Sequence, residues 1–366
     1  MNKTPLSIYI HIPFCKAKCG YCDFLSFAGC EHKINEYADA LCKDIAWSAQ
    51  KFAGYSVVTV FFGGGTPSLM PHAAFEKILN ALYKNFNIAQ NCYFSTEANP
   101  DAVDIASLKS LGFNRISFGV QTFNDAHLKS IGRIHTAQKA KEVVAQAHEL
   151  GFKDINIDLM FALPNQMLND FDKSLQTALE LPITHISCYA LTIEENTPMQ
   201  DFVTDENIDR KMYHLAKKRL DDAGFKHYEV SNWAKPGYEC AHNTGYWTGQ
   251  EYLGLGLGAS SYFNNERANK TTELDEYLKG NFDFILQEKI DHIGRMGEFM
   301  FLGLRQIDGI SSTEFLSRFG QSVQSVFANE IGQLLADGLI EQKDDKIRLT
   351  QRGLDIANVV FAEFLI

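Results

Sequence analysis

Short apolar runs of strand-like composition recur through the first half of the chain, and amphipathic segments of helical length separate them. The predicted strands cover residues 6–11, 57–62, 92–97, 115–120, 155–160 and 185–191. The predicted helices between them include residues 73–85, 102–111, 137–150 and 171–181. The helix at 137–150 is the clearest, because its apolar residues recur at helical spacing and Gly151 follows as a helix stop. Strands that alternate with helices predict parallel βαβ units.

The number of these units distinguishes between two kinds of barrel. A complete barrel of this type has eight strand–helix units, so six units predict an α/β fold with an open (β/α)6 partial TIM barrel. In such barrels the functional side chains gather at the C-terminal ends of the strands. We therefore expect the functional motifs directly after the predicted strands.

The alternation ends near residue 200. A predicted helix at 208–223 is followed by an aromatic and glycine-rich region at 228–262. The last part of the chain has predicted helices, then a small hairpin around 338–350 and a final helix, an order that resembles a winged helix. We predict three domains: a barrel core at 1–200, a barrel extension at 201–290, and a C-terminal α+β winged-helix-like cap at 291–366.

Composition is typical of a folded protein in a reducing compartment. The 366 residues include 45% hydrophobic residues, enough for a sizeable core. No apolar run approaches the roughly 20 residues of a membrane helix, and the N-terminal segment does not resemble an export signal. We therefore expect a cytoplasmic protein with no transmembrane segment, which leaves peripheral membrane contact open.

The charge balance argues against a nucleic-acid partner. The net charge is −11, and residues 291–366 carry 11 acidic and 7 basic side chains. An acidic surface repels a phosphate backbone, whereas a winged helix that reads DNA is usually basic. We expect no nucleic acid partner and interpret the C-terminal domain as a structural cap. A zinc-bearing DNA-binding protein is the alternative that this balance disfavours.

Three of the eight cysteines, Cys15, Cys19 and Cys22, lie within eight residues. In a chain without an export signal, such a group indicates a metal site rather than disulfides. Zinc would need a fourth ligand, which His11 could provide. A [4Fe–4S] cluster usually takes four cysteines, so three would leave one iron open. The spacing of the cysteines, three residues and then two between them just after the first predicted strand, favours the cluster, and zinc remains the alternative.

The cysteine spacing, Gly63-Gly64-Gly65-Thr66-Pro67 and Asn156-Ile157-Asp158 together resemble the radical S-adenosylmethionine (SAM) coproporphyrinogen dehydrogenase-like family. The resemblance covers nearly the whole chain and is strongest with the heme-chaperone branch. The dehydrogenases have another cysteine two positions after the third cluster cysteine, where this chain has Phe24, and a longer segment before the cysteine loop. Both departures disfavour the oxygen-independent coproporphyrinogen III oxidase, a decarboxylase, which remains the alternative enzyme function.

The resemblance implies a [4Fe–4S] cluster on the three cysteines, with SAM bound at its open iron and, in principle, cleaved reductively. Residues that follow successive strands are the candidates for SAM contacts. Strand-end polar residues are common in any barrel, but several on successive strands suit a polar ligand. The implied SAM contacts are Gly64, Gly65 and Thr66 at the methionine end, Arg133 at the carboxylate, Asp158 at the ribose, Glu97 and Gln121 at other polar atoms, Tyr9 and Tyr21 beside the cluster, and Ala190 at the adenine.

The segment at 242–247 is the candidate for heme contacts. Its His242 precedes Tyr246 and Trp247, and imidazole can ligate heme iron while aromatic side chains pack on a porphyrin. A hydrogen-bonded histidine that supports the barrel is an equally good interpretation, and Cys240 is another candidate ligand. The resemblance implies heme as a bound cofactor, acceptor hemoproteins as partners, and an electron donor for the cluster.

Overall fold

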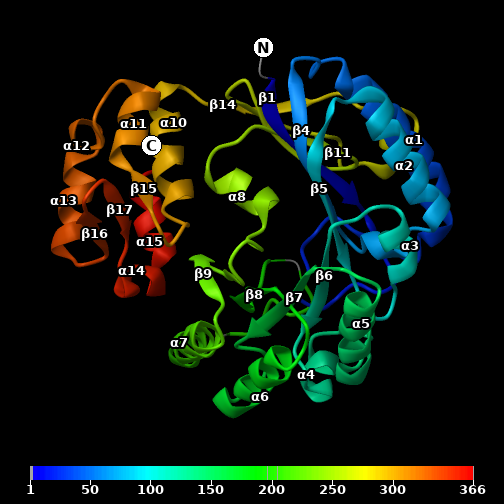
Figure 1. The fold of residues 1–366 in the computed structure, drawn as a ribbon, viewed down its shortest axis with the longest axis horizontal. Coiled ribbons are helices and arrows are strands. Elements are labelled where there is room, and N and C mark those ends of the chain that lie inside the picture. The colour runs from blue at the N-terminus through cyan, green and yellow to red at the C-terminus, as the bar shows by residue number, and fades with distance from the viewer. Residues whose placement is uncertain (1–2, 196, 204, 366) are drawn as a thin grey trace.

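The computed structural model describes residues 3–195, 197–203 and 205–365. Six parallel strands form the barrel in chain order, as Figure 1 shows. They are β1 (Thr4–Ile12), β4 (Tyr55–Gly64), β5 (Ile88–Ala98), β6 (Arg115–Gln121), β7 (Asp154–Phe161) and β8 (His185–Ala190). Every pair of neighbours in this series is parallel. The predicted open (β/α)6 barrel is confirmed.

Helices cover the outer face of the barrel (Figure 1). They are α1 (Ile34–Ala49), α2 (His72–Asn85), α3 (Ile105–Ser110), α4 (Asp125–Ser130), α5 (Ala137–Glu149) and α6 (Leu168–Leu179). The predicted helix at 102–111 is shorter than expected. Its N-terminus is at Ile105, because the Asp104 side chain accepts a hydrogen bond from the Ser107 amide at 3.0 Å and caps the helix there.

Strands from the second part of the chain extend the same sheet at both edges. Beyond β8 lie β10 (Asn232–Ala234) and β9 (Lys226–Glu229), after the long helix α7 (Glu206–Asp222). Beyond β1 lie β11 (Tyr252–Leu255), β12 (Ser260–Phe263), β13 (Glu266–Asn269) and β14 (Ile285–Lys289), giving 12 strands in all. The helix α8 (Ala241–Trp247) connects the two edges and contacts β4. The domain boundaries at 200 and 290 stay a prediction.

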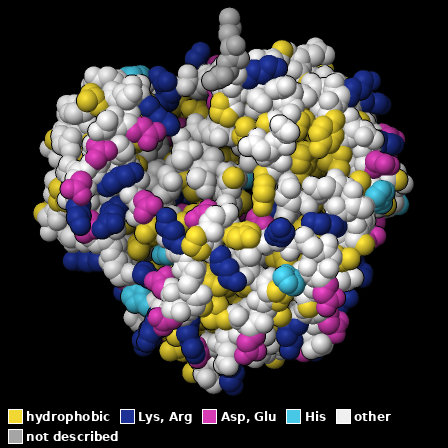
Figure 2. All heavy atoms as spheres, in the orientation of Figure 1, with side chains coloured by type: hydrophobic (Ala, Val, Ile, Leu, Met, Phe, Trp, Pro, Cys, Tyr) yellow, Lys and Arg dark blue, Asp and Glu magenta, His cyan; other side chains and the backbone are white. Residues whose placement is uncertain are grey.

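The C-terminal part has its own hydrophobic core, separate from that of the barrel. Its helices are α10 (His292–Gly303), α11 (Ser312–Phe319), α12 (Val323–Val326), α13 (Ala328–Ala336), α14 (Gln351–Asp355) and α15 (Ala357–Ala362). Its small antiparallel sheet has β15 (Ile310–Ser311), β16 (Ile340–Lys343) and β17 (Lys346–Leu349). This is the predicted winged-helix-like arrangement. Figure 2 shows basic and acidic side chains interspersed on the visible face of this part.

Within the described ranges, no helix is both long and apolar enough to cross a bilayer.

The extension is attached to the barrel through a buried ion pair. Lys270 Nζ lies 2.9 Å from Asp44 Oδ1, and both side chains are fully buried. Asp44 also accepts hydrogen bonds from the Gly256 amide and the Tyr277 hydroxyl, each at 3.0 Å. This carboxylate therefore connects α1 to the turn after β11, to the segment after β13, and to the short helix α9 (Leu274–Leu278).

Replacing Asp44 with Ala should lower the free energy of unfolding by about 3–5 kcal/mol, because it leaves the Lys270 ammonium buried without its partner. Chemical denaturation of the two proteins measures this difference. Lys279→Ala removes an exposed ion pair with Glu276 and serves as the control, which should unfold like the parent protein. Equal stability of Asp44→Ala and the parent protein would contradict the proposed role of the pair.

Candidate cluster and nucleotide site

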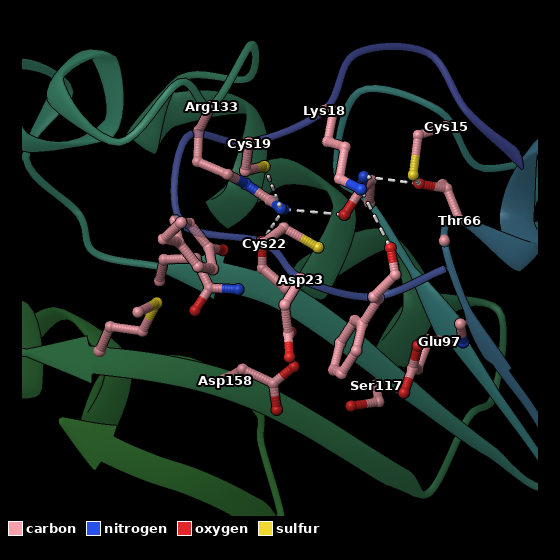
Figure 3. A pocket seen from close by; sticks show the side chains of 18 of the residues that line it. Cys15, Lys18, Cys19, Cys22, Asp23, Thr66, Glu97, Ser117, Arg133 and Asp158 are labelled. Carbon is pink, nitrogen blue, oxygen red and sulfur yellow. Dashed lines mark hydrogen bonds between the residues drawn. The ribbon is translucent and has the colours of Figure 1, made fainter. Parts of the chain in front are cut away.

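A cavity of about 460 Å³ opens at the C-terminal ends of the barrel strands. One wall is the segment after β1, which contains all three cysteines of the loop. The other walls come from the ends of β4 to β8, in agreement with the rule that barrel chemistry lies at these ends. Figure 3 shows the side chains that converge on this cavity.

The three cysteine thiols are free and belong to one wall of the cavity. Cys15 is buried at the end of β2 (Phe14–Cys15), while Cys19 and Cys22 are half-buried. Figure 3 shows Cys15 beside Thr66 and Cys19 beside Arg133, with Cys22 between them in this view. Among the described residues, no three His, Cys, Asp or Glu side chains are grouped as ligands of a single ion. Thiols spread along one cavity wall fit a multi-iron centre, in which each cysteine binds a different iron.

The end of β4 lies against the cysteine loop so closely that only glycine fits. Gly64 has φ of +113°, and a Cβ atom there would lie 2.6 Å from His11 Cε1. A Cβ atom on Gly65 would lie 2.7 Å from the Phe14 carbonyl oxygen and 3.0 Å from Cys15 Sγ. Both positions therefore expose backbone rather than side chain toward the cavity, as a close approach to a ligand requires.

A chain of hydrogen bonds runs from Cys19 to Cys15. Arg133 Nη1 donates to Cys19 Sγ at 3.5 Å, and Arg133 Nη2 donates to Asn99 Oδ1 at 2.8 Å. Asn99 Nδ2 donates to Thr66 Oγ1 at 3.1 Å, and that hydroxyl donates to Cys15 Sγ at 3.5 Å. The guanidinium is also bonded to the Gly119 carbonyl oxygen. These bonds fix Arg133 at the cavity wall and connect two of the three thiols.

Two carboxyl groups face the same cavity from β5 and β7. Burial, and secondly the Asp158 charge, raise the pKa of Glu97 to about 8. Burial also raises the pKa of Asp158, although Asn156 Nδ2 donates to its Oδ1 at 2.8 Å. Glu97 Oε2 accepts a hydrogen bond from the Gly64 amide at 3.2 Å. Two carboxyl groups that resist ionisation in a shared cavity suit a ligand that brings positive charge, as the SAM ammonium and sulfonium do.

Gln121 ends β6 in an unusual backbone conformation. Its φ is +68°, a left-handed value that is uncommon for residues other than glycine. Its side chain lines the cavity and accepts a hydrogen bond from the Tyr189 hydroxyl at 3.3 Å. The turn at Gln121 therefore ends the strand at the cavity and directs the side-chain amide into it. An extended backbone at this position would carry the strand past the cavity.

Comparison with known proteins supports one family. Residues 9–178 match the model of the Radical SAM superfamily, and residues 290–356 match the HemN C-terminal domain. The chain is 33% identical to "Heme chaperone HemW" of Bacillus subtilis over 374 residues, which cover 98% of this chain and 99% of that protein. It is 34% identical to "Heme chaperone HemW" of Escherichia coli, covering 99% of this chain and 98% of the relative. The chain belongs to the HemW family of radical SAM proteins.

A solved structure supports the fold. Coproporphyrinogen III oxidase (HemN) from Escherichia coli superposes with a TM-score of 0.88, covering 99% of this chain and 90% of that one at 24% identity. The likeness extends through the barrel and the C-terminal part. Membership in the radical SAM superfamily implies a [4Fe–4S] cluster and SAM, and the donor set of the cavity fits both.

The structure brings most of the predicted SAM residues of this HemW-family chain together. Those that line the cavity are Gly64, Gly65, Thr66, Glu97, Gln121, Arg133, Asp158, Tyr21 and Ala190. Tyr9 does not line it and lies instead along a neighbouring cavity, together with His11. His11 is bonded to the Tyr9 hydroxyl at 3.0 Å and to the Leu25 carbonyl oxygen at 2.8 Å, so both of its ring nitrogens have partners.

His242 lies inside the barrel and does not line the cavity at the strand ends. It is buried and stacks on Phe61, with ring centroids 5.1 Å apart. Its Nδ1 is bonded to Thr59 Oγ1 at 2.8 Å, and its Nε2 is bonded to the Tyr246 hydroxyl at 2.9 Å. Burial lowers the pKa of His242 to about 3, so the ring is neutral at physiological pH.

Other cavity residues of the HemW-family chain did not emerge from the sequence. They are Asn99, Ser117, Ser187, Tyr189 and Asn232. Ser117 precedes Gln121 on β6 at an even spacing, and Ser187 precedes Tyr189 on β8 in the same way. Alternate residues of a strand face the same side, so counting back in twos from Gln121 would have found Ser117. Ser187 lies an odd number of positions from Ala190, the predicted site residue of β8, and the same rule does not reach it.

Glu97→Gln should change how stability depends on pH. Because the folded pKa of Glu97 is about 8 and its ordinary value is 4.5, the folded state retains a proton that the unfolded chain has released. Stability of the SAM-free protein should therefore decline as pH rises through this window, and less so in Glu97→Gln. Thermal unfolding across the window measures this, with the exposed Glu149→Gln as control. Parallel pH profiles for all three proteins would contradict the assignment.

Proposed function

We propose that this chain is a radical SAM heme chaperone, which binds heme and delivers it to acceptor hemoproteins. Full-length identity of 33–34% with proteins named heme chaperone HemW carries the proposal. Phe24, at the position where the coproporphyrinogen dehydrogenases have another cysteine, favours this function over the decarboxylase. We propose the cytoplasm as its location, with an unidentified electron donor as a further partner.

We propose that Cys15, Cys19 and Cys22 hold a [4Fe–4S] cluster at the cavity wall. When bound, a cluster with one open iron supplies the electron that cleaves SAM reductively. The protein contributes position and charge. Arg133 presents a cation for the SAM carboxylate, while Gly64 and Gly65 allow close approach of the methionine end.

The remaining cavity residues would orient the rest of SAM. Asp158 would accept from a ribose hydroxyl, and Glu97 and Gln121 would order the other polar groups. Thr66 and Tyr21 would contact the ligand near the cluster, and the Ala190 backbone would contact the adenine. Of the predicted SAM contacts, Tyr9 alone lines the neighbouring cavity. The distance from its side chain to SAM would therefore be longer than for the other residues.

Anaerobic reconstitution should load about four irons and four sulfides per chain, as a [4Fe–4S] cluster requires. Replacing Cys15, Cys19 or Cys22 with Ala should abolish loading, because each thiolate binds a different iron. Cys188→Ala is the matched control, since this buried thiol lies on β8 outside the cavity lining. Iron and sulfide analysis with absorption spectra measures loading. Stoichiometric zinc without an iron chromophore would contradict the cluster.

Arg133→Ala and Asp158→Ala should each weaken SAM binding. A lost hydrogen bond between charged partners should cost about 1.5–3 kcal/mol of binding free energy. Isothermal titration of cluster-loaded protein measures this loss. The exposed Lys139→Ala on α5 is the control and should bind SAM as tightly as the parent protein. Unchanged affinity in both cavity variants, with the cluster intact, would contradict the SAM assignment.

The purified protein should bind heme at about one equivalent and should not decarboxylate coproporphyrinogen III. Heme titration followed at the Soret band measures binding, and product analysis with SAM and a reductant measures decarboxylation. His242→Ala should alter the Soret band if the imidazole ligates iron, which would require it to exchange its bond to Thr59 or Tyr246 for the metal. Formation of protoporphyrinogen IX would favour the oxidase instead.

A further inference from the structure

A second cavity of about 490 Å³ is lined by residues of β1, α8, β11, β12 and α10. Five aromatic side chains line it: Tyr9 of β1, Tyr246 and Trp247 of α8, Tyr252 of β11 and Tyr262 of β12. Tyr252 packs edge-on against Tyr246, with centroids 4.7 Å apart. Aromatic walls of this kind suit a flat apolar ligand, and the volume is that of an ordinary small-molecule site.

A third cavity of about 510 Å³ adjoins the second and has a different character. The two share Trp247, Gly249, Tyr262, Glu298 and Leu302 as lining residues, so they lie side by side. The third cavity contains several charged side chains from the C-terminal part, whereas the second is richer in aromatic side chains and has Arg267 and Glu298 as its charged ones. A ligand that spans both must therefore have an apolar body and a charged end.

The carboxylates of the third cavity already have partners. They are Glu251 with the Tyr55 hydroxyl, Glu298 with Arg267, Asp308 with Lys226, and Glu314 with Arg318. Two cations remain, Arg295 of α10 and Lys346 of β17. Within the described part of the chain, neither forms a salt bridge with a carboxylate. Arg295 and Lys346 are therefore the two lining cations that no described carboxylate pairs with, while Glu251 is bonded to a neutral hydroxyl.

Two buried donors in the same place have no acceptor among the described residues. They are Trp247 Nε1, on the wall shared by both cavities, and Arg295 Nε, in the third cavity. A buried N–H group without an acceptor costs about 1–3 kcal/mol, so such groups usually mark a missing ligand atom or water. Here both lie along the wall where the charged end of a ligand would be.

We infer that the two adjoining cavities form the heme site, with the macrocycle packed against Tyr246, Tyr252 and Tyr262 and its two carboxylates directed to Arg295 and Lys346. The inference rests on the proposed heme-binding function and adds the place and the mode of recognition. Carboxylates bound to cations form stronger hydrogen bonds than neutral pairs, and two anions match two free cations. His242 touches this site through its hydrogen bond to the Tyr246 hydroxyl.

The test compares heme with its dimethyl ester, which has the same macrocycle without the two negative charges. Each is titrated into full-length, cluster-loaded protein. The parent protein should bind heme about tenfold more tightly than the ester. The double variant Arg295→Gln/Lys346→Ala should bind heme and the ester about equally, because it lacks the two cations that distinguish the compounds. Lys346→Ala alone, an exposed position, should lose part of the preference and covers the case in which the double variant does not fold.

Lys343→Ala is the matched control, because Lys343 pairs with Lys346 across the same hairpin but does not line either cavity. It should retain the full preference for heme over the ester. If the parent protein prefers heme and the folded variants keep that preference, this site is overturned while heme binding stands. If the parent protein binds neither compound, the proposed heme function fails and this site with it.

Discussion

The central constraint on this molecule is that β1 pairs on both edges. It is parallel to β4 on one side and to β11 on the other, so the N-terminal strand lies in the middle of the 12-stranded sheet. Its alternate residues Leu6, Ile8, Ile10 and Ile12 are fully buried in the core. The intervening residues of β1 face the barrel interior. Of these, Tyr9 and His11 line the second cavity. Immediately after its end the chain enters the cysteine loop, so one strand positions both proposed ligand sites.

The local pattern of apolar and polar residues was enough to predict the barrel. Parallel strands buried on both faces are apolar runs, and each predicted strand lies within an observed one except for one residue of the run at 185–191. The strands of the extension were missed because they are short and pair across long distances in sequence. β11 forms its parallel pairs with a strand more than two hundred residues earlier, as in Ser7 with Tyr252. No periodicity within 228–262 encodes such a partner.

The proposed SAM cavity was predictable to the extent that strand ends define it. Glu97, Gln121 and Asp158 line it because each lies at or near the end of a barrel strand. Tyr9 was proposed from its proximity to the cysteines in sequence, and in the structure the pleat of β1 directs it toward the second cavity. Asn99 was missed although it connects Arg133 to Thr66, because a single amide after a strand has no distinguishing pattern.

The continuity of the sheet also limits how the chain can be divided. A fragment ending near residue 200 would contain the six barrel strands but would leave the β11 edge of β1 without its partner. An uncovered edge strand offers unpaired backbone groups to any neighbouring chain and promotes association. The same fragment would leave Asp44 buried without Lys270. The extension thus protects the barrel against self-association, and the barrel is complete as a folding unit only with residues that follow it by more than fifty positions.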